Sequence, residues 1–186
     1  MLFRSTLSSF VLKGLERLLL WYLKDGLFTG NFYAQHAYSK GLSTDTALSE
    51  AIDYIESSIY RKKIAVAASL DCSGAFDCVS YQAMREGLES KGVPGNIINW
   101  YDALLKGRKV TASIQGVTRT LTPGKGSPQG GILSPLVWNL VMDSLLTSFK
   151  GGPIKAVGYA DDILLIGSGI DPKIVAGNVQ EAINKT

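Results

Sequence analysis

The sequence of 186 residues has few cysteines and histidines, which excludes several kinds of protein. Cys72 and Cys78 are its only cysteines, and His36 is its only histidine. These three residues do not have the number or spacing of ligands that a structural zinc site needs. A disulfide framework is not expected, and reduced thiols favour an intracellular protein, nuclear or cytoplasmic, that is not secreted.

The sequence also lacks long hydrophobic runs, internal repeats and low-complexity segments. No stretch reaches the roughly 18–20 apolar residues of a membrane span, so no membrane partner is expected. Residues 1–23 are apolar enough to resemble a secretion signal, but Lys13, Glu16 and Arg17 interrupt them. The apolar side chains there fall near helical spacing, which predicts an amphipathic helix instead. These side chains are Phe10, Val11, Leu15, Leu18, Leu19 and Tyr22.

The composition indicates a packed globular domain. Hydrophobic residues make up 46% of the chain and charged residues 19%, which argues against a disordered tail. A chain of this length has room for one domain with a sizeable core. The formal net charge of +3 is compatible with a nucleic-acid partner but does not require one.

Hydrophobic periodicity and turn residues divide the rest of the chain into helices and strands. Helices are predicted over residues 44–60, 81–91, 96–106 and 135–149, and a last one begins at Asp171-Pro172. Strands are predicted over residues 64–70, 109–114, 117–121, 154–160 and 163–166. Gln115-Gly116 and Asp161-Asp162 are the expected hairpin turns. Helices packed on antiparallel strands indicate the α+β class.

Two of these elements carry specific packing expectations. Ser43 is the expected N-cap of the helix over residues 44–60. The small apolar residues 64–70 predict a central strand that is covered on both faces. Residues 61–63 (Arg-Lys-Lys) are either a solvated helix end or a contact to nucleic-acid phosphates. The expected buried stripe of the helix is Leu48, Ile52, Ile55 and Ile59.

Three acidic residues stand beside apolar segments. Asp71 follows the predicted strand 64–70, and Asp161 and Asp162 occupy the tip of an apolar hairpin. Taken singly, each has an ordinary explanation as a cap or turn residue. Two carboxylates about 4 Å apart repel by roughly 4 kcal/mol at an effective dielectric of 20, and a divalent cation between them reverses that sign. Carboxylate ligands favour magnesium or manganese.

Three segments of the sequence resemble the motifs of reverse transcriptases, in the order that family has them. Residues 69–77 (Ser-Leu-Asp-Cys-Ser-Gly-Ala-Phe-Asp) resemble its first catalytic motif. Residues 126–135 (Gly-Ser-Pro-Gln-Gly-Gly-Ile-Leu-Ser-Pro) resemble its Pro-Gln-Gly motif, and residues 159–162 (Tyr-Ala-Asp-Asp) its Asp-Asp hairpin. Residues 35–48 and 136–140 are similar to non-LTR retrotransposon reverse transcriptases in particular.

The resemblance implies the fold of a right-handed polymerase, with an antiparallel palm sheet packed by helices. We expect fingers at residues 1–63 and 81–125, and palm at 64–80 and 126–186. The thumb is expected to be absent. The implied activity is RNA-directed DNA synthesis from a deoxynucleoside triphosphate (dNTP), a DNA primer and an RNA template. The isolated chain is expected to be weak or inactive.

The resemblance also implies the metal ligands. Asp71 and Asp161 would bind two magnesium ions, or manganese, with Asp162 as the weaker carboxylate and the backbone carbonyl of Cys72 as a further ligand. The ions would lower the pKa of the primer 3′ hydroxyl and stabilise charge at the α-phosphorus.

A third set of residues resembles the nucleotide-binding positions of the family. Phe76 is similar to the ring that excludes a ribose 2′ hydroxyl by collision. The amides of residues 72–76, including Ser73, Gly74 and Ala75, would hold the triphosphate. Gln129 and Gly130 resemble contacts to the incoming nucleotide and template, Tyr159 resembles a residue that would lie near the primer end, and Arg4 resembles a phosphate-neutralising arginine. Other readings stay open: a group II intron, retron or telomerase type enzyme, a magnesium nuclease, and a non-catalytic retrotransposon remnant that at most binds nucleic acid.

Overall fold

The computed structural model describes residues 9–28, 30 and 32–186. Its helices and strands follow the predicted order, with one addition, the short helix α3 (Ala75–Cys78). The chain divides into two compact units, residues 1–30 with 74–141 and residues 31–73 with 142–186. The α+β prediction is confirmed, while the predicted boundaries of fingers and palm stay a prediction.

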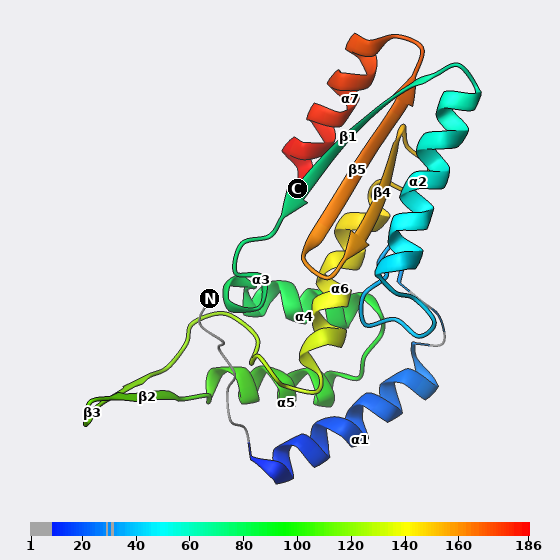
Figure 1. Cartoon of the computed structure of the whole chain (residues 1–186). Helices are drawn as coiled ribbons and strands as arrows, with labels where there is room; N and C mark the ends of the chain where they lie inside the picture. The colour runs from blue at the N-terminus through cyan, green and yellow to red at the C-terminus, as the bar shows by residue number, and fades with distance from the viewer. Residues whose placement is uncertain (1–8, 29, 31) are drawn as a thin grey trace. The chain divides into compact units, whose positions relative to one another are not determined.

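The second unit is built on a three-stranded antiparallel sheet (Figure 1). Its strands β1 (Ile64–Asp71), β5 (Asp162–Gly169) and β4 (Ile154–Tyr159) lie in the order β1-β5-β4. Asp162 pairs with Asp71 on one side and with Tyr159 on the other. The last residues of β1 and β4 therefore meet the first residue of β5 at one end of the sheet.

Strand β1 is an edge strand, so the prediction of a central strand is wrong, although a helix contacts it on each face of the sheet. Its exposure alternates along its second half, and Asp71 and Ser69 are exposed while Leu70 and Ala68 are half-buried. The central strand is β5, in which Ile163, Leu165 and Ile166 are at most 1% exposed. Residues 64–70 misled the prediction because small side chains such as alanine fit an edge as well as a core.

Helix α2 (Thr44–Tyr60) covers one face of the sheet (Figure 1). Its start is as predicted, since the Ser43 hydroxyl accepts a hydrogen bond from the Thr46 N–H at 3.3 Å. Its buried face is not as predicted: Ala47 and Ala51 pack against Val157 and Ile166 of the sheet. Small side chains let the helix lie close to the strands. The expected stripe is exposed at Leu48 (60%), Ile52 (41%) and Ile59 (59%), with Ile55 half-buried.

Helix α7 (Pro172–Lys185) covers the opposite face of the sheet. The helix begins where predicted, and Asp171 caps it, because its carboxylate accepts a hydrogen bond from the Lys173 N–H at 2.8 Å. A Cβ added to Gly167 of β5 would lie 2.8 Å from the Val179 side chain. The glycine therefore allows the close packing of helix on strand.

The first unit is mostly helical. It contains α1 (Phe10–Gly26), α3, α4 (Tyr81–Ser90), α5 (Gly95–Lys106) and the start of α6 (Ser134–Thr147), whose last residues belong to the second unit. Ser80 caps α4, since its hydroxyl accepts a hydrogen bond from the Ala83 N–H at 3.0 Å. Helix α1 forms as predicted, but its buried side chains are Glu16 and Leu23, and Phe10 is 91% exposed.

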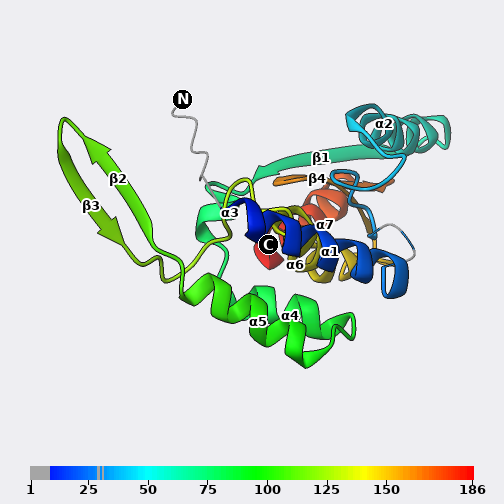
Figure 2. The ribbon, with the colours of Figure 1, turned by 90° about the horizontal axis from the view of Figure 1, so that it is seen from below.

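A hairpin of β2 (Val110–Ile114) and β3 (Val117–Leu121) projects beyond the end of α5 (Figure 2). Gln115 and Gly116 both have positive φ, at 50° and 80°, as a two-residue type I′ turn requires. The predicted hairpin is confirmed. No helix in the described part of the chain is both long and apolar enough to cross a membrane.

Candidate active site

Two carboxylates lie opposite each other at the end of the sheet. Asp71, the last residue of β1, is the register partner of Asp162, the first residue of β5. The Cys72 N–H donates to the Asp161 carbonyl at 3.2 Å, which is the bond that flanks a non-hydrogen-bonded antiparallel pair. In such a pair the Cα atoms are about 4.5 Å apart and both side chains stand on the same face. Like charges placed there destabilise the sheet unless a cation lies between them.

Asp161 occupies the turn between β4 and β5, next to these two carboxylates. Burial raises the pKa of the Cys72 thiol, and the negative charges of Asp161, Asp71 and Asp162 raise it further. All three carboxylates therefore lie within electrostatic range of one thiol. All of them belong to the second unit.

These residues fit a divalent cation of the magnesium type. Among the residues that the structure describes, no group of three or more His, Cys, Asp or Glu side chains is arranged so that it could hold a metal ion. Magnesium does not need such a cage, because it is usually bound through one or two carboxylates completed by water and substrate phosphates. Asp71 and Asp162, paired across the strands, supply a donor set of that kind.

Two tyrosines lie beside the carboxylates in the second unit. Tyr159 is the register partner of Asp162 on β4. The pKa of the Tyr38 hydroxyl is raised, first by burial and then by the charges of Asp161 and Tyr159. A groove between α2 and the sheet is lined by Thr44 and Leu48 together with Tyr159 and Asp162. Asp162 thus borders a surface depression, where a ligand has access to it.

Sequence reasoning missed the residue that holds the turn. Gln35 is fully buried, and its amide bonds both polar backbone atoms of Ala160: the Ala160 N–H donates to Oε1 at 2.9 Å, and Nε2 donates to the Ala160 carbonyl at 3.2 Å. The resemblance of residues 35–48 to the family marked this segment, but a lone glutamine in a loop gives no periodic signal that predicts the contact.

The first unit joins two of the motifs that the sequence singled out. The Ser127 N–H donates to the Phe76 carbonyl and the Gly126 N–H to the Val79 carbonyl, both at 2.7 Å. Gly126 has φ 86°, and a Cβ added there would lie 2.7 Å from the Asp77 carbonyl oxygen. The glycine-rich loop therefore packs directly on the backbone of residues 76–79.

A chain of buried hydroxyls anchors the same loop. Ser127 bonds Tyr101 at 3.2 Å and Ser134 at 2.7 Å, and Ser134 donates to the Pro128 carbonyl at 2.9 Å. Burial raises the pKa of Tyr101 to about 12, so its hydroxyl keeps its proton. The Glu16 carboxylate accepts from the Ile132 N–H at 3.1 Å just beyond the loop. These bonds fix the main chain on both sides of Gln129.

Phe76 and Gln129 are both placed on this scaffold. The Phe76 ring lies 5.6 Å from the Trp138 ring, centroid to centroid, with the planes tilted by 34°. This contact fixes the ring on one side. The Gln129 amide donates a long hydrogen bond of 3.5 Å to the Asp77 carboxylate, which places the amide near α3.

The remaining candidates have mixed outcomes. The Cys72 N–H is engaged by Asp161, so the expected set of triphosphate donors begins at Ser73, which is exposed. Gly74 has φ 67° and precedes α3, and Ala75 is buried. Gly130 is exposed with φ 90°. Arg4 lies outside the described residues.

The candidate site residues fall into the two units of the chain. The structure gathers Asp71, Cys72, Asp161, Asp162 and Tyr159 in one unit, and Phe76 and Gln129 in the other.

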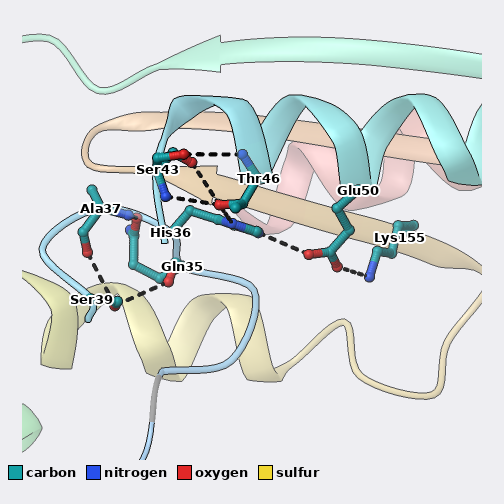
Figure 3. Close-up of polar contacts among 8 residues, drawn as sticks. All are labelled: Gln35, His36, Ala37, Ser39, Ser43, Thr46, Glu50 and Lys155. Atoms are coloured by element: carbon teal, nitrogen blue, oxygen red, sulfur yellow. Dashed lines mark hydrogen bonds and ion pairs between the residues drawn. The ribbon is translucent and has the colours of Figure 1, made fainter. Parts of the chain in front are cut away.

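A second polar cluster ties the segment after Gln35 to α2 and β4 (Figure 3). The buried His36 ring bonds the Thr46 hydroxyl and the Glu50 carboxylate, both at 2.9 Å. Glu50 also pairs with Lys155 of β4. Burial on its own would raise the pKa of the Glu50 carboxyl, but Lys155 and then His36 outweigh burial and hold the pKa below its usual value.

The Glu50 cluster predicts a pH dependence of stability. A carboxyl whose pKa is lower in the folded state stabilises the fold above its unfolded pKa, and this contribution is lost as the pH falls through the folded pKa. Glu50→Gln should therefore be less stable than wild type at pH 7, and the difference should shrink below about pH 4.3. Thermal unfolding between pH 7 and 3 measures it, with the exposed Glu56→Gln as control. A difference that stays constant down to pH 3 would contradict the ion pair.

Comparison with known proteins gives a family. The family model described as "Reverse transcriptase (RNA-dependent DNA polymerase)" matches residues 3–185. Two curated relatives are Pol polyproteins of the retrotransposable element R2. The one from Popillia japonica is 30% identical over 61% of this chain, and the one from Nasonia vitripennis is 33% identical over 68%. The chain spans only 18% and 13% of their lengths.

A solved structure supports the fold. Telomerase from Candida tropicalis, in complex with a fragment of telomeric RNA, matches 92% of this chain and 30% of its own, with a TM-score of 0.62. The sequence identity is 12%, so this likeness concerns the fold alone.

Proposed function

Because this chain belongs to the reverse transcriptase family, we propose that it carries the catalytic centre of an RNA-directed DNA polymerase from a non-LTR retrotransposon. The substrates we propose are a deoxynucleoside triphosphate, a DNA primer and an RNA template. The chain covers a small part of its curated relatives, so this activity is proposed for the protein to which the segment belongs.

The observation that carries the proposal is the placement of Asp71. The register of β1 on β5 puts this residue opposite Asp162 and beside the turn that holds Asp161, although about 90 residues separate them in the sequence. Three carboxylates at one end of a sheet reduce the stability of the fold, because each adds electrostatic repulsion and a desolvation cost. A purely structural role therefore does not explain them.

Carboxylates at this end of the sheet, completed by water and substrate phosphates, would hold the divalent metal, which we propose to be magnesium. When bound, the metal supplies stabilisation of the charge that develops on the transferring phosphoryl group. Asp71 and Asp161 would be the principal ligands, with Asp162 in a lesser role. The chain's own contribution is to hold these oxygen atoms in place before the substrate arrives, so that little reorganisation is needed during the reaction.

The first unit would select the nucleotide. Phe76, fixed by Trp138, presents a ring that a ribose 2′ hydroxyl would meet and a deoxyribose would not. Gln129 would lie beside the incoming base, on the loop anchored by Ser127 and Ser134. Residues 74–76 of this unit, together with Ser73, which belongs to the second unit, would offer backbone N–H groups to the triphosphate.

Primer extension under single-turnover conditions tests the proposal. The chain, and the same chain extended by a thumb, are mixed in excess with a labelled primer annealed to an RNA template, dNTPs and magnesium. We expect extension that requires the template and the metal, and that is strongest in the extended form. Absence of extension by both forms, with folded protein, would favour a non-catalytic remnant that at most binds nucleic acid.

Nucleotide selection gives a separate prediction. Phe76→Ala should raise the use of ribonucleotides relative to deoxynucleotides by about tenfold or more, because a steric collision of roughly 1.4 kcal/mol or more is removed. Phe76→Tyr keeps the ring and serves as the control. The measurement is the ratio of rNTP to dNTP incorporation at one template position. An unchanged ratio in Phe76→Ala would remove the steric role.

A further inference from the structure

The turn that carries Asp161 has an unfavourable backbone. Ala160, the residue before Asp161, has φ 56°, a left-handed conformation that residues other than glycine rarely adopt. Such a conformation persists where surrounding contacts over-determine it. The contacts that do so here come from a segment far away in the sequence, residues 34–38.

Gln35 makes two hydrogen bonds to the backbone of Ala160 through its side-chain amide. Its oxygen accepts from the Ala160 N–H at 2.9 Å and its nitrogen donates to the Ala160 carbonyl at 3.2 Å. The same oxygen accepts from the Ala37 N–H at 3.1 Å, which holds the amide in orientation (Figure 3). The side chain is 0% exposed, so water cannot replace it.

The main chain around Gln35 is docked on β4 as well. Gln35 forms a parallel bridge with Gly158, in which the Gly158 N–H donates to the Ala34 carbonyl at 2.7 Å and the His36 N–H donates to the Gly158 carbonyl at 2.8 Å. A Cβ on Gly158 would lie 3.4 Å from the Gln35 amide nitrogen. The segment therefore lies against the strand that leads into the turn.

His36 holds this segment from the other side. Its ring bonds Thr46 in the first turn of α2 and Glu50 one turn later, and Glu50 in turn pairs with Lys155 of β4 (Figure 3). Gln35 is thereby fixed in place by both its neighbours and the helix. Its side-chain amide hydrogen-bonds the backbone of the turn. In the described part of the chain it makes no hydrogen bond to any of the three carboxylates.

We propose that Gln35 is a positioning residue for the active site: its buried amide fixes the left-handed conformation of Ala160 and so aims the carboxylate of Asp161. The consequence for catalysis rests on the proposed function, whereas the conformational part does not. Loss of the amide should loosen the turn without removing a metal ligand.

The decisive variants are Gln35→Met and Gln35→Glu in the full chain. Methionine fills the same buried space without hydrogen bonds, and glutamate keeps the acceptor but turns an anionic oxygen toward the Ala160 carbonyl. The exposed Gln180→Ala is the matched control for losing a glutamine. Circular dichroism and thermal unfolding establish that each variant is folded.

The first readout is amide hydrogen exchange of Cys72, measured by NMR. The Cys72 N–H donates to the Asp161 carbonyl and does not touch Gln35, so it reports the turn independently of activity. We expect at least tenfold faster exchange in Gln35→Met than in wild type. The second readout is Mn²⁺ affinity by electron paramagnetic resonance, which should fall by roughly tenfold or more, as for other residues that orient metal ligands.

A second substitution makes the test specific. Ala160→Gly removes the cost of the left-handed conformation, so Gln35→Met/Ala160→Gly should recover slow Cys72 exchange and most of the Mn²⁺ affinity. Gln115→Gly relieves the same kind of φ in the β2–β3 turn, which belongs to the other unit, and should recover nothing. Unchanged Cys72 exchange in Gln35→Met, or equal rescue by Gln115→Gly, would overturn the positioning role. Failure of wild type to bind Mn²⁺ would overturn the proposed function instead, and leaves the exchange result to decide the positioning role.

Discussion

Replacing Asp161 with asparagine is expected to reduce primer extension on an RNA template by roughly a thousandfold or more, about 4 kcal/mol of transition-state stabilisation. Asp71→Asn should have an effect of similar size, because Asp71 comes from β1 and Asp161 from the turn between β4 and β5, and neither can replace the other. Asp162→Asn should cost less, since this residue resembles the weaker member of the pair. The rate of single-nucleotide addition under single-turnover conditions measures all three.

The asparagine variants keep the shape of the side chain, so their effect on folding is expected to be small or stabilising. Removing one of two facing carboxylates relieves the repulsion between Asp71 and Asp162 in the metal-free chain. Asp45→Asn, an exposed residue in the first turn of α2, is the matched control and should extend primers at the wild-type rate. A loss of activity that followed a loss of thermal stability in these variants would point to misfolding rather than to metal binding.

Gly126→Ala is expected to destabilise the fold by about 2–4 kcal/mol. The residue has φ 86°, and the added methyl group would lie 2.7 Å from the Asp77 carbonyl oxygen and 2.9 Å from that of Phe76. Both atoms belong to the backbone, which cannot move aside without breaking the bonds from Gly126 to Val79 and from Ser127 to Phe76.

Gly124→Ala is the control for this prediction, because an added Cβ there meets nothing within 4 Å and no left-handed φ is involved. It should change stability by less than about 0.5 kcal/mol. Urea denaturation followed by circular dichroism gives both values. Equal midpoints for the two alanine variants would show that the loop does not pack on residues 76–79 as described.

The sequence predicted the element order and the ends of most helices because local signals mark them. Ser43, Ser80 and Asp171 cap helices with side-chain bonds that any such residue before an apolar run can make. Gln115-Gly116 marks its hairpin through the φ values that the turn requires. The prediction that Asp71 lies near Asp161 and Asp162 came from the order of the three motifs, because no local signal in the sequence contains this information.

The packing of α2 and β1 could not be predicted in the same way. Hydrophobic periodicity selects the bulkiest face of α2, whereas the sheet accepts the face with Ala47 and Ala51, where the helix approaches most closely. Leu48 and Ile52 are left exposed as a result. The contact of Gln35 with the turn could not be predicted, because its partner Ala160 is 125 residues away in the sequence.

Binding of Mn²⁺ to the 186-residue chain, followed by electron paramagnetic resonance with Mg²⁺ as competitor, tests the carboxylate centre most directly. Wild type and Asp45→Asn should bind the ion and release it to Mg²⁺, and Asp71→Asn/Asp161→Asn should not bind. Equal binding by the double variant, or none by folded wild type, would contradict a metal centre at this end of the sheet.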